Sequence, residues 1–311
     1  MTLANTRRNG TATKRILFPI LLLFTICECA AVGTAQDSEA TSVDEVRGAL
    51  IRNDLKIAVQ EARQGIQEYP ASVPLYELLG GALFKSGAND EARAAFQKAI
   101  DLAPLESVNY FNLARVDLAM NRYADVVTSL TTFLKFEPHD PAAHVLLGRA
   151  YHNLNQTLLG IEHFKIALAI DDKLPLAHFH LGYAELSLGN SETAIEEFRK
   201  EMDINPGFYE PYWMAGDIEL RRGNLKAAED FYRQGVTIKE DAFQAHYGLG
   251  QVLSRTSRWT EAEREFQVAL KYSPESVETH YALGRLYQQM GKSQEARQQF
   301  EMVSDLHSQT H

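Results

Sequence analysis

Two successive segments between Val73 and Glu106 carry apolar residues at the spacing of one buried helix face. The apolar residues of the first segment are Tyr76, Leu79, Leu83 and Phe84, and those of the second are Ala92, Phe96, Ala99 and Ile100. A polar stretch that contains Gly87 separates the two segments, and Pro104 ends the second one. The pattern therefore predicts two helices joined by a short turn, which is a helix hairpin.

The same pattern recurs every 34 residues along the chain. A frame without insertions gives the units 39–72, 73–106, 107–140, 141–174, 175–208, 209–242, 243–276 and 277–310. Within a unit, the seventh position is usually Leu, the eighth is Gly or Ala, the twentieth is small, and the thirty-second is often Pro. The twenty-fourth position is bulky: Phe96, Leu130, Phe164, Phe198, Tyr232, Phe266 and Phe300. Small residues allow two helices to approach closely, and the bulky residue fills the space between layers.

This unit length and residue order resemble the tetratricopeptide repeat family. The resemblance implies an all-α fold, a right-handed α-solenoid superhelix of about eight helix hairpins, in which each unit packs on its neighbours. The first unit is degenerate, with Glu45 and Val46 in place of Leu-Gly, and the last has the polar Ser304 at a position that is usually apolar. At the thirty-second position Asp172 and Glu240 replace proline, which predicts that the helices there extend slightly further.

The first 35 residues have the features of a cleaved signal peptide. Basic residues from Arg7 to Arg15 precede an apolar run, Ile16–Cys27, and small residues surround Ala35. The alternative is an uncleaved membrane anchor, but this run is shorter than the roughly 20 residues that span a bilayer. We therefore expect a Sec-type signal peptide over residues 1–35, a short linker over 36–41 and a repeat array over 42–310. Such a protein would be exported, and periplasmic or secreted if bacterial, with no stable membrane span after cleavage.

Charge and cysteine content narrow the choice of partner and chemistry. The chain has 31 basic and 41 acidic residues, and loss of residues 1–35 would change its net charge from −10 to −13. An acidic body of this kind argues against nucleic acid as a partner, because phosphates require a basic surface. Both cysteines, Cys27 and Cys29, lie in the predicted signal peptide, so the processed chain would have neither a disulfide nor a thiolate metal site.

The resemblance also implies where a partner would bind. In the family, the first helices of the hairpins line a concave groove, and the second, fifth, ninth, twelfth and thirteenth positions of each unit point into it. The candidate peptide-binding residues at these positions are Phe111, Arg115, Arg149, Phe179, Trp213, Arg221, Tyr247, Arg255, Tyr281 and Arg285. Acidic residues at the same positions are Glu77, Glu210, Asp217 and Glu278. The aromatic candidates, Phe111, Phe179, Trp213, Tyr247 and Tyr281, form a row at the fifth position. The alternative is that they pack against neighbouring helices.

Other known chemistries find no support in the sequence. The carboxylate-binding lysines and asparagines of some family members are absent, since only Asn112 matches that pattern. The triplet Gly291-Lys292-Ser293 lacks the glycine that a phosphate-binding loop needs at Leu286. His144, His178, His246 and His280 share the fourth position, but stacked helices would hold them too far apart to bind one metal ion. We therefore predict no catalytic residues, no metal site and no cofactor.

The sequence thus predicts an exported, non-catalytic scaffold that binds a protein or an extended peptide in its groove. The alternative is a structural or assembly component of a cell-envelope complex that works by self-association. In that case the chain would form a homo-oligomer. An enzyme or a carrier of small ligands ranks last, because no stretch outside the repeats could hold a catalytic domain.

Overall fold

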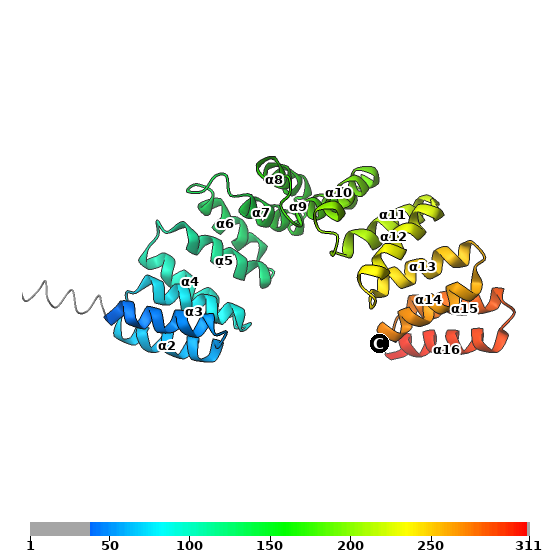
Figure 1. The fold of residues 1–311 in the computed structure, drawn as a ribbon, viewed down its shortest axis with the longest axis horizontal. Helices are drawn as coiled ribbons and strands as arrows, with labels where there is room; N and C mark the ends of the chain where they lie inside the picture. The colour runs from blue at the N-terminus through cyan, green and yellow to red at the C-terminus, as the bar shows by residue number, and fades with distance from the viewer. Residues whose placement is uncertain (1–37, 310–311) are drawn as a thin grey trace, which may run out of the picture. The chain divides into compact units, whose positions relative to one another are not determined.

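The computed structural model describes residues 38–309, and in this range all the regular secondary structure is helical (Figure 1). A first helix covers residues 38–51. The helices that follow are α2 (Leu55–Glu68), α3 (Val73–Lys85), α4 (Asn89–Leu102), α5 (Ser107–Ala119), α6 (Tyr123–Phe133), α7 (Pro141–Asn153), α8 (Thr157–Ile170), α9 (Ala177–Ser187), α10 (Ser191–Ile204), α11 (Glu210–Arg222), α12 (Leu225–Ile238), α13 (Phe243–Arg255), α14 (Trp259–Tyr272), α15 (Val277–Gln289) and α16 (Ser293–Gln309). The all-α solenoid of about eight hairpins is therefore confirmed.

The turn inside each hairpin obeys the 34-residue frame. The fifteenth residue of every unit has a positive φ, between 57° and 85°: Asn53, Gly87, Asn121, Asn155, Gly189, Gly223, Ser257 and Gly291. Glycine and asparagine adopt this left-handed conformation at low cost, and Ser257 is the exception that the sequence did not reveal. The repeated turn places the second helix of each unit against the first in the same way.

Two expectations about helix boundaries were wrong. Residues 38–41, which were assigned to a linker, are helical, and the degenerate first unit forms a hairpin with α2. Helices α8 and α12 end at Ile170 and Ile238, the same place in the unit where α4 and α10 end, although proline is missing after them. In both units the carbonyl group of the thirty-second residue lies at hydrogen-bond distance from a histidine of the next unit, as it does where proline is present. The predicted signal peptide lies outside the described residues.

The described residues pack as two compact bodies, each made of several repeat units, divided between Asn109 and Tyr110. In the N-terminal body, α2, α3 and α4 pack in sequence, and Asn109 donates a hydrogen bond of 2.8 Å to Glu77. The C-terminal body contains all ten candidate binding residues. Its core is formed by the bulky twenty-fourth residues, among which Phe164, Phe198, Tyr232 and Phe266 are almost completely buried.

Each of these rings covers the glycine at the eighth position of its own unit. A Cβ added to Gly148 would lie 2.7 Å from Phe164, and one added to Gly216 would lie 2.7 Å from Tyr232. The absence of a side chain at this position is therefore what allows the ring of the second helix to lie against the backbone of the first.

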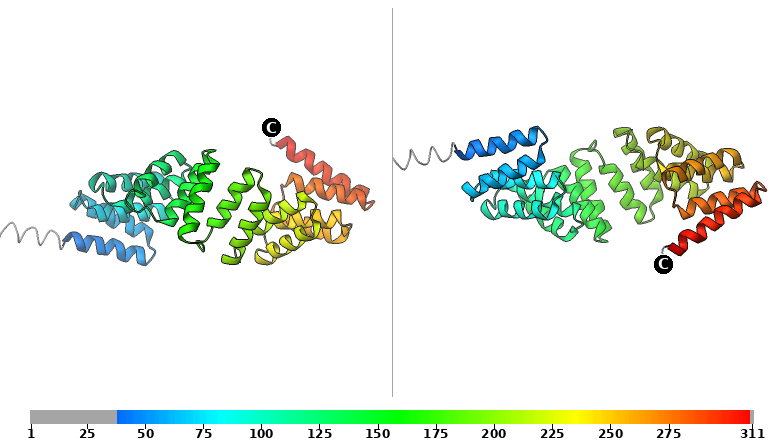
Figure 2. Two further views of the ribbon diagram at one scale, coloured as in Figure 1. Left: turned by 90° about the horizontal axis from the view of Figure 1, so that it is seen from above. Right: turned by 90° about the horizontal axis from the view of Figure 1, so that it is seen from below.

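First helices of neighbouring repeats in the C-terminal body also contact one another: α7 with α9, α11 with α13, and α13 with α15. Among the described helices, second helices have no comparable contacts with each other. Because the first helices lie closer to one another than the second helices do, the C-terminal body curves with its first helices on the inner side. Figure 2 shows α16 at the end of the array, beside α15. Within residues 38–309, none of the helices combines the length and the apolar character needed to span a bilayer.

Candidate functional site

The aromatic row at the fifth position is mostly half-buried. Phe111, Phe179, Trp213 and Tyr247 are partly covered, whereas Tyr281 exposes 51% of its surface. The rings pack on the second helix of their own hairpin, with centroid distances of 5.9 Å for Phe179–Phe198, 6.0 Å for Tyr247–Phe266 and 5.9 Å for Tyr281–Phe300. The structure thus gives these rings a packing role within the hairpin, and leaves Tyr281 at the C-terminal end most open.

Among the described residues, four candidate arginines of the groove lack the carboxylate partners that most other arginines of the C-terminal body have. Five of the seven arginines outside the candidate positions pair with carboxylates: Arg122, Arg222, Arg233, Arg258 and Arg297. No carboxylate of the described residues lies at ion-pair distance from Arg149, Arg221, Arg255 or Arg285. Arg221, Arg255 and Arg285 are exposed, while burial lowers the pKa of the half-buried Arg149. The exposed groove arginines therefore keep their capacity to bind an anionic group.

Four of the candidate residues come together in one cavity between α13 and α15. The cavity has a volume of about 490 Å³ and is lined by Tyr247, Gln251, Arg255, Glu278, Tyr281 and Arg285, among others. We call it the tyrosine–arginine pocket. The remaining candidates, Phe111, Arg115, Arg149, Phe179, Trp213 and Arg221, lie outside it. Sequence reasoning did not single out Gln251, which is polar and lies at the ninth position of its unit.

Hydrogen bonds orient two side chains of the tyrosine–arginine pocket. Gln251 donates a bond of 2.9 Å to the hydroxyl of Tyr247, so the hydroxyl can still donate its own proton into the pocket. Burial raises the pKa of Tyr247, with Glu278 and Asp217 adding to the effect, so this phenol is neutral at physiological pH. Arg255 donates a 3.2 Å bond to the carbonyl of Leu220 at the end of α11 and is thereby held above the groove.

A second group of groove residues lies on α7 and α9. The ring of Phe179 contacts Phe208 at 4.9 Å and Tyr183 at 6.3 Å, and Tyr183 in turn meets His152 at 5.4 Å. We call these residues, with Phe198, the aromatic cluster. Burial, with smaller effects of Arg149 and His152, lowers the pKa of the neighbouring His180 to about 3. In the aromatic cluster Phe179 packs against rings of its own chain, while Tyr183 stays exposed.

The histidines at the fourth position connect consecutive units. Their Nε2 atoms lie 2.9–3.2 Å from the carbonyl oxygen six residues earlier, at Pro138, Asp172, Glu240 and Pro274. Their Nδ1 atoms lie 2.5–3.0 Å from the side chain 19 residues later, at His163, Glu197, Glu265 and Gln299. Both ring nitrogens are therefore used for structural hydrogen bonds. No group of three or more metal-binding side chains occurs among residues 38–309.

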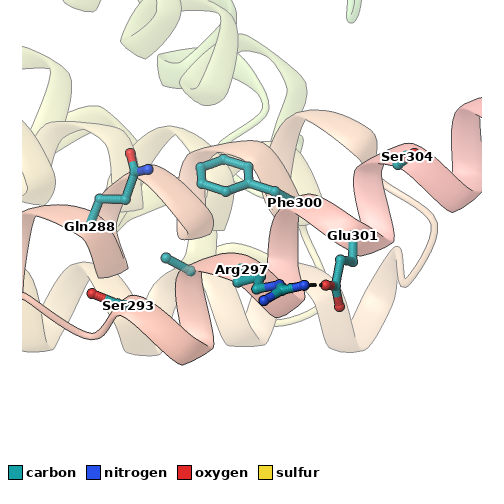
Figure 3. Close-up of a pocket in the computed structure, with 7 residues that line it drawn as sticks. Gln288, Ser293, Arg297, Phe300, Glu301 and Ser304 are labelled. Atoms are coloured by element: carbon teal, nitrogen blue, oxygen red, sulfur yellow. Dashed lines mark hydrogen bonds and ion pairs between the residues drawn. The ribbon is translucent and has the colours of Figure 1, made fainter.

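The outer face of the last hairpin has a different character from the groove. A depression of about 410 Å³ lies there between α15 and α16, over the half-buried ring of Phe300 (Figure 3). Its rim is polar, and Arg297 and Glu301 on α16 pair with each other at 2.9 Å. Ser304 is exposed, as expected for a helix that ends the array. This face resembles a polar cap, whose charges already satisfy each other.

Comparison with known proteins agrees with the repeat frame. Family models described as tetratricopeptide repeat match residues 43–107 and 111–175, 176–208 and 209–241, and 241–309. The chain is 31% identical over 91 residues to "Tetratricopeptide repeat protein 33" of Xenopus laevis, which is 29% of this chain and 35% of that protein. The chain thus spans about a third of the length of this relative.

Solved structures share the fold. A tetratricopeptide repeat protein from Parabacteroides merdae ATCC 43184 superimposes with a TM-score of 0.62 at 17% identity, covering 80% of this chain and 98% of the other. The protein MamA, residues 41 to the end, from Desulfovibrio magneticus RS-1 gives a TM-score of 0.53 at 24% identity, covering 55% and 96%. At these identities the likeness concerns the arrangement of helices.

Proposed function

Because the chain belongs to the tetratricopeptide repeat family, we propose that it is a non-catalytic, exported scaffold that binds a segment of a partner polypeptide in its groove. The family's repeats typically serve as protein-interaction modules, which supports the first part of this proposal. The observation that carries the proposal is the tyrosine–arginine pocket, where two tyrosines and two arginines without carboxylate partners line one cavity.

The chemistry of the pocket favours a partner segment with an acidic residue beside an apolar or aromatic one. The guanidinium groups of Arg255 and Arg285 can each form paired hydrogen bonds with a carboxylate. The half-exposed ring of Tyr281 offers a flat apolar surface with a polar tip, as is common in protein interfaces. Glu278 at the edge would oppose a second acid, so a single acidic residue fits best.

Capture of partners by the purified chain tests this function. We expect Tyr281→Ala with Arg285→Ala to abolish capture while the helical content stays unchanged. The matched control is Trp259→Ala with Arg264→Ala, which removes an exposed aromatic residue and an exposed arginine from α14, outside the groove. Equal capture by the groove variant and the control would overturn the proposal.

Self-association is the alternative function, and the free end of the array is where it would occur. The two charged side chains at the depression on α16, Arg297 and Glu301, already pair with each other, so neither is left to attract an opposite charge on a second copy. Binding of a different partner is therefore the better supported function. Light scattering separates the two, since stable oligomers that form without added partner would favour self-association.

Export rests on residues 1–35, whose charged, apolar and small-residue segments are typical of a signal peptide. Mass spectrometry of the chain expressed with these residues tests the proposal. We expect the processed chain to begin near Gln36 and to occur outside the cytoplasm. A chain that keeps Met1 or its neighbours in the cytoplasm would contradict export.

A further inference from the structure

Three residues of neighbouring helices depart together from the repeat pattern beside the tyrosine–arginine pocket. Tyr232 on α12 is the only tyrosine at the twenty-fourth position, where the other units have Phe, Leu or, in the first unit, Ala62. Gly248 on α13 is the only glycine at its sixth position among the second to eighth units, where Leu, Asn, His, Met or Ala are found. Asp217 on α11 is the only acid at the ninth position from the second unit on, where three units have arginine.

These three residues form one structural arrangement, in which Tyr232 bonds to Asp217 and Gly248 leaves room for the ring. The Tyr232 ring is fully buried, and its hydroxyl donates a 2.5 Å bond to Oδ1 of Asp217. The ring passes where a side chain of residue 248 would be, since a Cβ on Gly248 would lie 2.2 Å from the ring and 2.6 Å from its hydroxyl oxygen. Glycine at this position is therefore required for the tyrosine to reach the aspartate.

Packing alone does not account for this arrangement. A phenylalanine at position 232 would fill the space, as the phenylalanine of five other units does, without a polar atom to satisfy. The hydroxyl instead holds a carboxylate in one orientation on the inner side of the helices. A fixed carboxylate binds a ligand with less loss of side-chain entropy than a mobile one.

The second carboxylate oxygen of Asp217 is open to the groove. No hydrogen bond or ion pair engages Oδ2 in the described residues, and this atom is not among the buried polar atoms that lack a partner. The charge of Arg221 on the same helix acts on Asp217, and the charges of Arg221 and of Arg255 on α13 act on Tyr232. Burial raises the pKa of Asp217 despite the bond from Tyr232 and the charge of Arg221, so the carboxylate is incompletely compensated.

We infer that Asp217 forms a second subsite of the groove, which binds a basic side chain of the same partner segment whose acidic residue occupies the tyrosine–arginine pocket. The inference rests on the proposed function. Its occupant is a lysine or arginine, because these side chains supply the charged donors that the open oxygen accepts. The partner segment would therefore carry opposite charges at a fixed separation.

The helix spacing sets this separation. Packed helices lie about 8–10 Å apart, so α11 is about 12–15 Å from the middle of a pocket between α13 and α15. An extended peptide advances about 3.3 Å per residue, and side chains two or four residues apart point the same way. A basic and an acidic residue about four positions apart would reach the two subsites from one face of the peptide.

Selection from a display library of random 12-residue peptides tests the inference without knowledge of the natural partner. Peptides selected on the unmodified chain should be enriched in an acidic residue about four positions from a basic one. Peptides selected on Asp217→Asn should keep the acid and lose the basic residue, because asparagine can still accept from Tyr232 but carries no charge. Asp230→Asn is the control, since it removes an exposed acid from α12 and gives the same net charge.

Affinities of one selected peptide complete the test. Replacement of its basic residue by serine should weaken binding to the unmodified chain about tenfold, and binding to Asp217→Asn less than about twofold. A basic residue that is absent from the first pool, or that persists on Asp217→Asn, would overturn the inference. If the acidic residue still depends on Arg285, the proposed function stands alone. Failure to select any peptide whose binding depends on Tyr281 or Arg285 would overturn both.

Discussion

The groove of the C-terminal body contains two regions that use the same positions of the repeat. One is the aromatic cluster on α7 and α9, and the other is the tyrosine–arginine pocket on α13 and α15. In the first region Phe179 is covered by Phe208, a ring in the loop before α11. The residue that follows Tyr247 at the same distance is Ser276, which instead accepts a hydrogen bond from Thr279 at the start of α15. The loop residue thus adds a ring contact to Phe179 that Tyr247 lacks.

The two regions also treat charge differently. Near the aromatic cluster Arg149 and His180 are both half-buried and His180 is neutral, whereas Arg255 and Arg285 in the pocket are exposed. Equivalent positions in a repeat protein therefore need not share a role. In one region they stabilise the fold, and in the other they remain available to a partner. The predictions below test this division, in order of decreasing effect on stability.

Loss of an aromatic ring should separate the regions most clearly. Phe179→Ala removes contacts with four rings and should lower the free energy of unfolding by about 2–4 kcal/mol. Tyr281→Ala should lower it by less than about 1 kcal/mol, because half of this side chain is exposed. Urea unfolding followed by circular dichroism measures both, and similar losses would contradict the division.

A glycine on a first helix should tolerate a methyl group only where no side chain packs against it. Gly248→Ala places a Cβ against the ring of Tyr232 and should cost about 1–3 kcal/mol. Gly81→Ala is the control, since a Cβ there meets no atom and should stabilise α3 by about 0.5–1 kcal/mol. Thermal unfolding of both variants provides the measurement. A neutral effect of Gly248→Ala would show that the Tyr232 ring can move aside.

Acid should destabilise the region around the aromatic cluster. The pKa of His180 is about 3 in the folded chain, mainly because of burial, and near 6.5 when unfolded, so its contribution is complete above about pH 6.5 and is lost as the pH falls towards 3. His180→Gln should therefore lose less stability than the unmodified chain between pH 7 and pH 5. An identical pH dependence would contradict this.

His246 should respond in the opposite direction. Burial alone would lower its pKa, but the Glu265 carboxylate and the Glu240 carbonyl outweigh burial and raise it. Its stabilising contribution is complete below about pH 6.5 and is lost as the pH rises through the raised pKa. Nuclear magnetic resonance titration of the two imidazoles would show the opposed shifts directly.

The smallest effect on stability is expected for the arginines of the pocket. Arg285→Gln should change the free energy of unfolding by less than about 0.5 kcal/mol, yet weaken partner binding and its dependence on salt. Arg149→Gln should cost about 1 kcal/mol, because its half-buried stem packs in the groove. Unfolding and binding assays of both variants give the comparison. A large stability loss at Arg285 would place it in the core.

Much of the fold could be predicted from sequence, because the information is local and repeated. The spacing of apolar residues located the hairpins, and Gly87, Gly189, Gly223 and Gly291 located turns with positive φ. The serine turn at Ser257 was not recognisable, since serine rarely adopts that conformation. The helical state of residues 38–41 was also missed, because their polar character is compatible with a linker or with an exposed helix.

The candidate site was only partly predictable. Tyr247, Arg255, Tyr281 and Arg285 were named from their repeat positions, and the structure brings them into one cavity. The same rule selected Phe179, whose ring packs against Phe198 and Phe208 and lies outside this cavity. The departures at Tyr232 and Gly248 were visible in the repeat alignment, but their meaning depends on a contact with Asp217 across three helices.

The amino-acid sequence by itself determined the repeat length, the two helices of each unit and the residues that face the core, because helix periodicity and turn preferences act over a few residues. Only the tertiary structure decided which groove positions are open. That outcome depends on side chains from different helices, such as Phe208 over Phe179 or Tyr232 against Asp217, which meet only when neighbouring hairpins pack. Distances between such side chains follow from packing in three dimensions, and no spacing along the chain encodes them.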